Sequence, residues 1–398
     1  MPKRKSEQIN LFDISELLST AACVPAIRAA VKEWREKDYP GTTETTRELL
    51  DFWFNQDHIM PNGTPFKYHN AQREAIETLI YIFEVAKIRS RKELLTTYAF
   101  SQKDLRLPPY DNFARYCIKM ATGSGKTKVM TLAIVWQYAN AIKENAADYA
   151  KTFLIIAPNV IVFERLKTDF EGGRIFRTDP LIPKHYRVWW DMEYYMRGDT
   201  EKAYSSGALY LTNIQQFYER PDSASSQEPD IMTQILGPAP ATKKVEMTDF
   251  DKRIAKREGH MLVINDEAHH THDEDNEWNK FIRNLHAQKP LSLQLDFSAT
   301  PRYSKGSLFA WTIFDYPLKQ AILDRIVKRP MKGISNIEEA KSDIASVKYQ
   351  GFMVAAVERW KEYRQQLSDL KKKPILFIML NTTDEAEDIG DWLRTKYP

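Results

Sequence analysis

Cysteine is scarce in this sequence: its 398 residues include only Cys23 and Cys117. Neither has a partner at metal-ligand spacing, which argues against a disulfide framework and against a cysteine-based zinc site. Long apolar runs are also lacking, so no membrane span is expected. The basic N-terminus, residues 1–6, is not followed by the apolar core of a signal peptide. These absences favour a reducing, cytoplasmic setting with no membrane partner.

An excess of one charge is missing as well. The 57 lysines and arginines nearly balance the 54 acidic residues, which leaves a net charge of +3. This balance permits nucleic-acid binding without requiring it. The hydrophobic fraction of 43% is typical of a globular protein, and the length predicts roughly two or three domains. The sequence shows no repeat of the solenoid type.

Residues 1–65 are predicted to form a helical accessory region. Apolar residues at helical spacing occur in 11–18 and 27–34, and a further helix is expected over Glu44–Phe54, between two breaker segments. No residue here suggests chemistry.

From about residue 66, short apolar runs alternate with longer helical stretches. This alternation predicts an α/β fold with a parallel sheet and helices on both faces. The candidate strands are Tyr116–Met120, Thr152–Ala157, Val188–Trp190, Leu209–Leu211, Met261–Ile264, Leu293–Phe297 and Ile375–Leu380. We expect one domain over 66–325, interrupted by a surface insertion at 220–259, and then a linker and the start of a second domain over 326–398.

A glycine-rich segment between a predicted strand and a predicted helix is the strongest local pattern. It consists of Thr122, Gly123, Ser124, Gly125, Lys126 and Thr127. Such loops wrap their backbone amides around phosphates, Lys126 would reach the β and γ phosphates, and the Thr127 hydroxyl would bind Mg²⁺. Met120 stands where the strict pattern has glycine. The alternative is a strand-to-helix turn that binds nothing.

Two adjacent carboxylates follow the strand Met261–Ile264. In a nucleotide site, Asp266 would hold Mg²⁺ through its waters, and Glu267 would orient and help deprotonate the attacking water. One alternative is a solvated polar loop. The other is a zinc site, because the segment is rich in metal-binding residues: His269, His270, His272, Asp273 and Glu274.

A third pattern, Ser298-Ala299-Thr300-Pro301, follows the strand Leu293–Phe297. In this order the three patterns resemble those of superfamily 2 helicases. The run that begins at Asp266, together with residues 315–318 and 326–330, resembles the motor (Res) subunit of type III restriction enzymes and its DEAD/DEAH-box relatives. The resemblance covers about 66–398 and implies a RecA-like domain that uses ATP and Mg²⁺.

The resemblance also implies roles for individual residues. Gln72 and Tyr68 match the adenine-reading motif, in which a carboxamide pairs with the base and a ring stacks on it; alternatively, Gln72 is an exposed helix residue. Ser298, Ala299 and Thr300 match the motif that couples hydrolysis to domain movement; the alternative is a helix cap.

Polar strand ends match the family's contacts to the nucleic-acid backbone. These residues are Pro158, Asn159, Thr212 and Asn213. Arg165 and Lys167 would add salt-dependent attraction. Ordinary polar strand ends are an equal alternative. A nearby aromatic group offers either core packing, which is favoured, or base stacking: Trp189, Trp190, Tyr194 and Tyr195.

The family's motor has two RecA-like domains, and the second one only begins here. A helix over 351–370, the strand Ile375–Leu380 and a helix over 384–396 are expected, with no arginine finger and no nuclease segment. We therefore expect a fragment that binds ATP and Mg²⁺, hydrolyses ATP slowly or not at all, and does not cut DNA.

The predicted function is the ATP-binding module of a DNA-dependent translocase in a type III restriction or related defence enzyme. Its partners would be duplex DNA or a displaced strand, and a methylation or specificity subunit. The alternatives are another superfamily 2 DNA or RNA helicase, and a catalytically silent scaffold.

Overall fold

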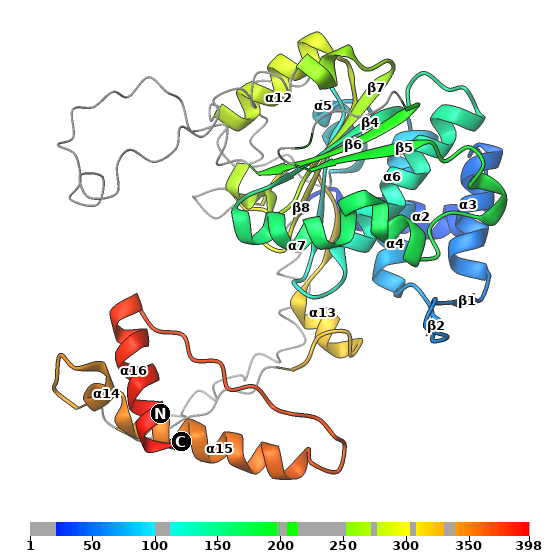
Figure 1. The fold of residues 1–398 in the computed structure, drawn as a ribbon. Coiled ribbons are helices and arrows are strands. Elements are labelled where there is room, and N and C mark those ends of the chain that lie inside the picture. Colours follow the sequence, from blue (N-terminus) through cyan, green and yellow to red (C-terminus); the bar gives the residue numbers. More distant parts are fainter. Residues whose placement is uncertain are drawn as a thin grey trace, which may run out of the picture. The chain divides into compact units, whose positions relative to one another are not determined.

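A parallel sheet forms the centre of the first of two compact units, which comprise Met1–Lys328 and Arg329–Pro398 (Figure 1). The computed structural model describes residues 21–99, 112–196, 199, 205–213, 252–271, 277–302, 308–329, 337 and 340–397. Within these residues the sheet has seven strands in the order β5-β6-β4-β7-β8-β3-β9, and all neighbours are parallel. The strands are β3 (Arg115–Met120), β4 (Ala150–Ala157), β5 (Met192–Met196), β6 (Gly207–Asn213), β7 (His260–Asn265), β8 (Leu291–Ser298) and β9 (Thr312–Tyr316). The predicted α/β class with a parallel sheet is confirmed.

Helices surround this sheet. The longer ones are α2 (Val24–Glu36), α3 (Glu44–Asn55), α4 (Asn70–Ile80), α5 (Arg91–Tyr98), α6 (Lys126–Lys143), α7 (Val160–Phe170) and α12 (Glu277–Gln288). Short elements are the hairpin β1 (His58–Ile59) and β2 (Pro65–Phe66), the π-helical turn η1 (Tyr81–Val85), and η2 (Glu171–Gly173), α8 (Arg174–Thr178), η3 (Lys184–Tyr186), η4 (Ala268–Thr271) and α13 (Leu318–Leu323).

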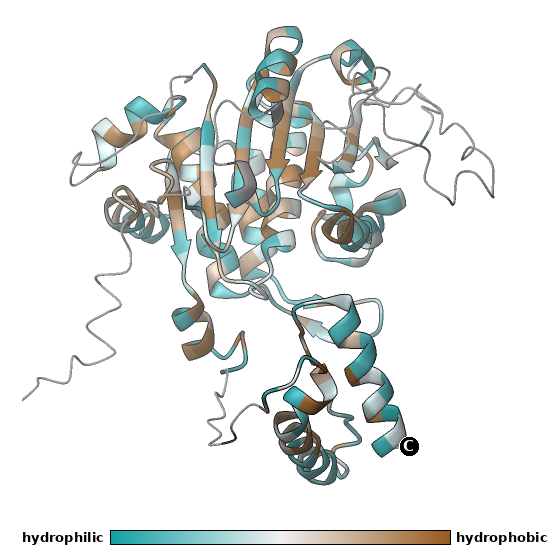
Figure 2. Ribbon diagram, turned by 90° about the vertical axis from the view of Figure 1, so that its left-hand side faces the viewer, coloured by the Kyte–Doolittle hydropathy of each residue, from teal (hydrophilic) through white to brown (hydrophobic). Residues whose placement is uncertain are grey.

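Alternating side chains of the strands build two cores, one on each face of the sheet. On β7, Leu262 and Ile264 belong to the larger core, which also contains α4 and α6, whereas Met261 and Val263 belong to the smaller core beneath α12. Strands covered on both faces are continuously apolar, and Figure 2 shows this as brown central strands.

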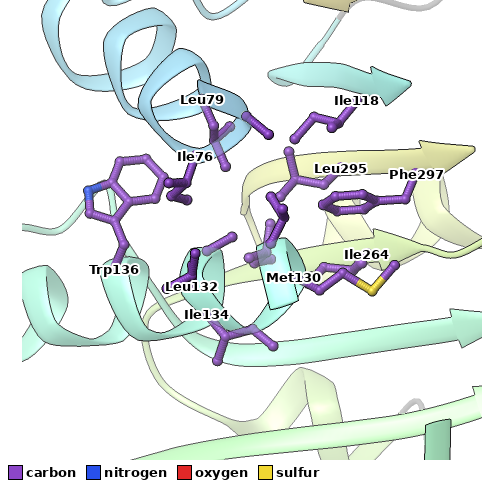
Figure 3. Packing of buried hydrophobic residues seen from close by; sticks show 14 of the residues in the cluster. Ile76, Leu79, Ile118, Met130, Leu132, Ile134, Trp136, Ile264, Leu295 and Phe297 are labelled. Carbon is purple, nitrogen blue, oxygen red and sulfur yellow. The ribbon is translucent and has the colours of Figure 1, made fainter. Parts of the chain in front are cut away.

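Helix α6 lies in the middle of the larger core. Every residue from Val129 to Ala141 is buried, as expected of a helix that is covered all round. Figure 3 shows its Met130 and Leu132 among Ile76 and Leu79 of α4 and side chains of β3, β7 and β8. Each such side chain contributes about 1.5–3 kcal/mol on burial, so this core fixes the N-terminal end of α6.

The predicted accessory region shares this core where it is described. Ile27 of α2 and Leu49 of α3 have no exposed surface and belong to the same cluster as α4 and α6. No boundary between compact units falls near residue 65. The segment 11–18 lies outside the described residues, as does most of the predicted insertion, but Ile254 near its end is buried in the smaller core.

Three strand predictions need correction. The predicted strand Val188–Trp190 is a turn, in which Trp189 N–H donates to Tyr186 O, and β5 begins later, at Met192. Strand β9 (Thr312–Tyr316) was missed, because no strand was predicted between Leu293–Phe297 and Ile375–Leu380.

The third correction concerns the second unit, which contains α14 (Ala345–Lys348), α15 (Gln350–Gln366) and α16 (Thr383–Lys396). The two longer helices match the prediction, but residues 375–380 form no strand. Ile375, Phe377 and Met379 are each at least 83% exposed. A strand requires a neighbour for its backbone hydrogen bonds, and none of the described residues of this unit provides one.

Candidate active site

Three neighbouring strands, β7, β8 and β3, carry the predicted motifs at their carboxyl ends. The glycine-rich loop follows β3, the two carboxylates follow β7, and Ser298 ends β8. Because carboxyl ends of parallel strands meet at one edge of a sheet, residues far apart in sequence gather there.

The loop after β3 is closed by its own hydrogen bonds. Ser124 donates to Ala121 O from its backbone N–H (3.1 Å) and from its hydroxyl (2.6 Å). Gly123 and Gly125 have φ values of +81° and +88°, which L side chains rarely adopt, so glycine is required at both positions. Helix α6 then begins at Lys126. Its free N–H groups and dipole make such a helix start favourable for phosphate.

Met120 explains the departure from the strict pattern. Its side chain has no exposed surface and belongs to the larger core. This position is therefore the last residue of β3 rather than part of the loop, and the core accommodates a side chain there.

Lys126 and Glu267 form an ion pair across the site. Lys126 Nζ lies 2.6 Å from Glu267 Oε1, and the two side chains are 8% and 21% exposed. Glu267 has a φ of +49°. A left-handed conformation outside glycine costs on the order of 1 kcal/mol, and Glu267 is one of seven non-glycine residues with positive φ in the described part of the chain.

Asp266 is more deeply buried than Glu267, with 1% of its surface exposed. Its Oδ1 accepts from Glu267 N–H (3.0 Å), and its Oδ2 lies 2.6 Å from Nη2 of Arg165 on α7. Burial raises the pKa of the Asp266 carboxyl above its usual value; the nearby Lys126 and Arg165 act in the opposite direction, and Glu267 adds to the rise.

His269 connects the acidic segment with β8. Its Nδ1 lies 3.1 Å from Ser298 Oγ and 3.5 Å from Glu267 Oε2, and Ser298 Oγ also accepts from Thr300 N–H at 3.0 Å. The Ser298 hydroxyl thus closes a turn. The alternative of a helix cap does not apply, because no helix begins at the described residues directly after Ser298. From the sequence, His269 was predicted as a possible zinc ligand and as part of the run beginning at Asp266 that resembles superfamily 2 helicases, without a role of its own. The adjacency of β7 and β8, which places Ser298 beside it, was the missing signal.

The zinc alternative has no support within the described residues. They contain no group of three or more histidines, cysteines or carboxylates arranged to hold a metal ion. His272, Asp273 and Glu274 lie outside them.

Gln72 contacts the glycine-rich loop. Its Oε1 accepts from His69 N–H at 2.9 Å, which caps α4, and its Nε2 lies 3.5 Å from Ser124 O. The side chain is buried, so the alternative of an exposed helix residue is wrong. A Cβ atom at Gly125 would lie 2.2 Å from Gln72 Nε2, which is a second reason why this position requires glycine.

Tyr68 does not present its ring to a base. It is 5% exposed, its hydroxyl donates to Pro180 O (3.1 Å), and its ring packs edge-on against Phe66 and Phe54. The adenine-stacking role predicted for Tyr68 conflicts with this packing. Phe66, which is half-buried, is the more accessible ring of this group.

The residues predicted to contact nucleic acid are mostly buried. Pro158, Thr212 and Asn213 are covered, whereas Asn159 is half-buried and caps α7 by accepting from Val162 N–H at 2.9 Å. The Asn213 side chain has no hydrogen-bond partner among the described residues.

The aromatic group near β5 mainly packs within the protein. Tyr195 stacks on Tyr210 at 5.1 Å between ring centroids, and Trp190 and Tyr194 contact Phe176. This arrangement favours core packing over a base-stacking platform.

The parallel sheet, the left-handed glycines before α6 and the acidic end of β7 define a RecA-like nucleotide-binding domain of the superfamily 2 helicase type. The sequence model of one family, type III restriction enzyme, res subunit, matches residues 65–303. This is more than half of the chain, and the chain belongs to that family. No curated protein matches it. Within the described part of the chain, no helix combines the length and apolar character needed to cross a membrane.

Proposed function

We propose that the chain is the ATP-binding module of a DNA-dependent ATPase that acts as the translocating subunit of a type III restriction or related defence enzyme. The proposal rests on one observation: Lys126, Glu267 and Asp266 lie close together beside a loop with two left-handed glycines. ATP and Mg²⁺ are the proposed cofactors.

The donor set fits a magnesium nucleotide. The Thr127 hydroxyl at the start of α6 and the Asp266 carboxylate at the end of β7 offer oxygen atoms, the ligands that Mg²⁺ prefers. When bound, Mg²⁺ would neutralise charge on the phosphates.

Each side chain then has a defined task. Lys126 would bind the β and γ phosphates in place of Glu267, and the freed carboxylate would accept a proton from water. The amides of Thr122–Lys126 would hold the phosphates. Gln72, anchored to the loop, would read the adenine edge with its carboxamide. Through His269, the position of Glu267 is linked to Ser298 and thereby to the Ser298–Thr300 turn, which we propose couples hydrolysis to domain movement.

The proposed partner is DNA, as duplex or displaced strand, contacted by backbone and side chains near Asn159 and Asn213 and by the cationic face of α7. These contacts would position a strand without reading its sequence. A separate methylation or specificity subunit would then provide sequence recognition.

The test is Mg²⁺-dependent ATP turnover with and without duplex DNA, with RNA as competitor. We expect binding of ATP with slow turnover, stimulation of that turnover by DNA in preference to RNA, and loss of both binding and turnover in Lys126→Ala. Lys143→Ala is the matched control, because Lys143 lies at the opposite end of α6 and pairs with Glu48 (3.1 Å). Preference for RNA would indicate another superfamily 2 helicase. ATP binding that survives in Lys126→Ala would contradict the proposed site.

A further inference from the structure

Protein cations occupy both acidic side chains of the site. Lys126 pairs with Glu267, and Arg165 Nη2 lies 2.6 Å from Asp266 Oδ2. The Arg165 bridge is asymmetric: the Asp266 side chain is 1% exposed, whereas that of Arg165 is 55% exposed. Asp266 is therefore buried in the protein, whereas Arg165 is accessible to solvent.

Arg165 occupies the side of Asp266 that a metal would need. Asp266 Oδ1 already accepts from Glu267 N–H, so Oδ2 is the oxygen whose partner can be exchanged. A buried carboxylate without a cation is costly, so Arg165 stabilises Asp266 in the nucleotide-free protein. Two cations held at one carboxylate oxygen repel each other, so Mg²⁺ at Asp266 would weaken the pairing with the guanidinium and favour its release.

A displaced Arg165 would remain at the surface of α7. This helix begins at Val160, after its cap Asn159 near the carboxyl end of β4, and also carries Lys167. Guanidinium groups bind phosphate oxygens in a bidentate manner, and a half-exposed arginine can reach a ligand in solvent. The phosphate chain of a nucleic acid is the ligand that fits this side of the proposed site.

We propose that Arg165 is a positioning residue that holds Asp266 in the nucleotide-free protein and exchanges it for a nucleic-acid phosphate when the magnesium nucleotide binds. This inference rests on the proposed function. Since coupling between two binding sites is reciprocal, nucleotide should tighten nucleic-acid binding and nucleic acid should tighten nucleotide binding by the same factor.

The experiment measures the affinity of a fluorescein-labelled single-stranded oligonucleotide by anisotropy, with and without Mg²⁺ and a non-hydrolysable ATP analogue. For the natural protein we expect the analogue to tighten binding by a factor between about 5 and 150. In Arg165→Gln the factor should fall to about 1 on the same scale. Arg165→Lys should retain part of it, because it keeps the charge but not the bidentate geometry.

Lys167→Gln is the matched control. It removes the same charge from the same helix, so it should weaken oligonucleotide binding equally with and without the analogue and leave the factor unchanged. A second readout is the Mg²⁺ concentration that half-saturates binding of a fluorescent ADP. Without oligonucleotide, this concentration should be lower in Arg165→Gln, since a competing cation is gone.

The outcomes separate the two levels of the argument. If the natural protein binds neither nucleotide nor oligonucleotide, the proposed function and this inference both fail. If it binds both without coupling, or if Arg165→Gln keeps the full factor, only this inference fails. If Arg165→Gln loses nucleotide affinity but the analogue still tightens oligonucleotide binding by the full factor, Arg165 binds the phosphates of the nucleotide itself. The proposed exchange is then wrong.

Discussion

The edge formed by the carboxyl ends of the strands has two halves: the ends of β3 and β7, and the ends of β4 and β6. The two halves differ in how their polar side chains are used. At the ends of β3 and β7, charged side chains pair with groups of other elements: Glu267 pairs with Lys126, and Asp266 pairs with Arg165 of α7. At the ends of β4 and β6, the uncharged polar residues are buried or serve their own backbone, as Asn159 does in capping α7. Charged residues that need partners from other elements therefore mark a site more reliably than polar strand ends, which local structure can satisfy.

The largest expected effect is at Glu267. We expect Glu267→Gln to lower ATP turnover by about 10² to 10⁴, the usual contribution of a general base, and to leave nucleotide binding within a few-fold of normal. Turnover by rapid quench and affinity by fluorescence titration check the two parts. If turnover persists in this variant, Glu267 is not the general base, and the proposed difference between the two halves of the edge is contradicted.

Gln72 tests whether the nucleotide half reads the base. Gln72→Met keeps the length of the side chain but loses the carboxamide, whose oxygen would accept from the N6 amino group of adenine. Guanine has the acceptor O6 at this position, so we expect the preference for ATP over GTP to fall by about tenfold, or ~1.4 kcal/mol. Competition binding with both nucleotides measures this preference. An unchanged preference would restrict Gln72 to holding the loop.

Asn159 tests the opposite half. Asn159→Ala should lower the free energy of unfolding by about 1 kcal/mol, the usual cost of losing an N-cap, whereas Asn159→Ser should retain most of it. Urea denaturation provides the comparison. If Asn159→Ser is stable but loses oligonucleotide affinity, the residue contacts nucleic acid in addition to capping the helix.

The smallest effect on stability is expected at Asn213. Replacing a buried polar group that has no hydrogen-bond partner among the described residues by an apolar one of similar shape is nearly neutral, so Asn213→Leu should change the free energy of unfolding by less than about 1 kcal/mol. A loss above about 2 kcal/mol in urea denaturation would reveal a protein partner and contradict this account of the β6 end.

The sequence predicts the fold where strands are apolar throughout. β4, β7 and β8 are such runs, covered on both faces, and were predicted close to their observed bounds. β5 was misplaced because Val188–Trp190 has the composition of a strand, but Val188 is 84% exposed and the segment forms a turn. Residues 375–380 also have the composition of a strand, but no described residue of their unit pairs with them, which no local pattern reveals.

The site was partly predictable for a similar reason. The glycine-rich loop and the Asp266-Glu267 pair are local patterns, whereas Lys126 and Glu267 meet across 141 positions and Arg165 and Asp266 across 101. Those pairs depend on the strand order. The same holds for His269, whose partner Ser298 lies on the neighbouring strand, and for Tyr68, whose burial depends on packing against Phe54.

The central claim is that Lys126 leaves Glu267 to bind the phosphates of a magnesium nucleotide. Its most direct test is the equilibrium binding of a fluorescent ATP analogue with Mg²⁺ to the natural protein, Lys126→Ala and Lys143→Ala. The account predicts binding that is weakened by about a hundredfold or more in Lys126→Ala and is unchanged in Lys143→Ala. Equal binding by all three proteins would contradict it.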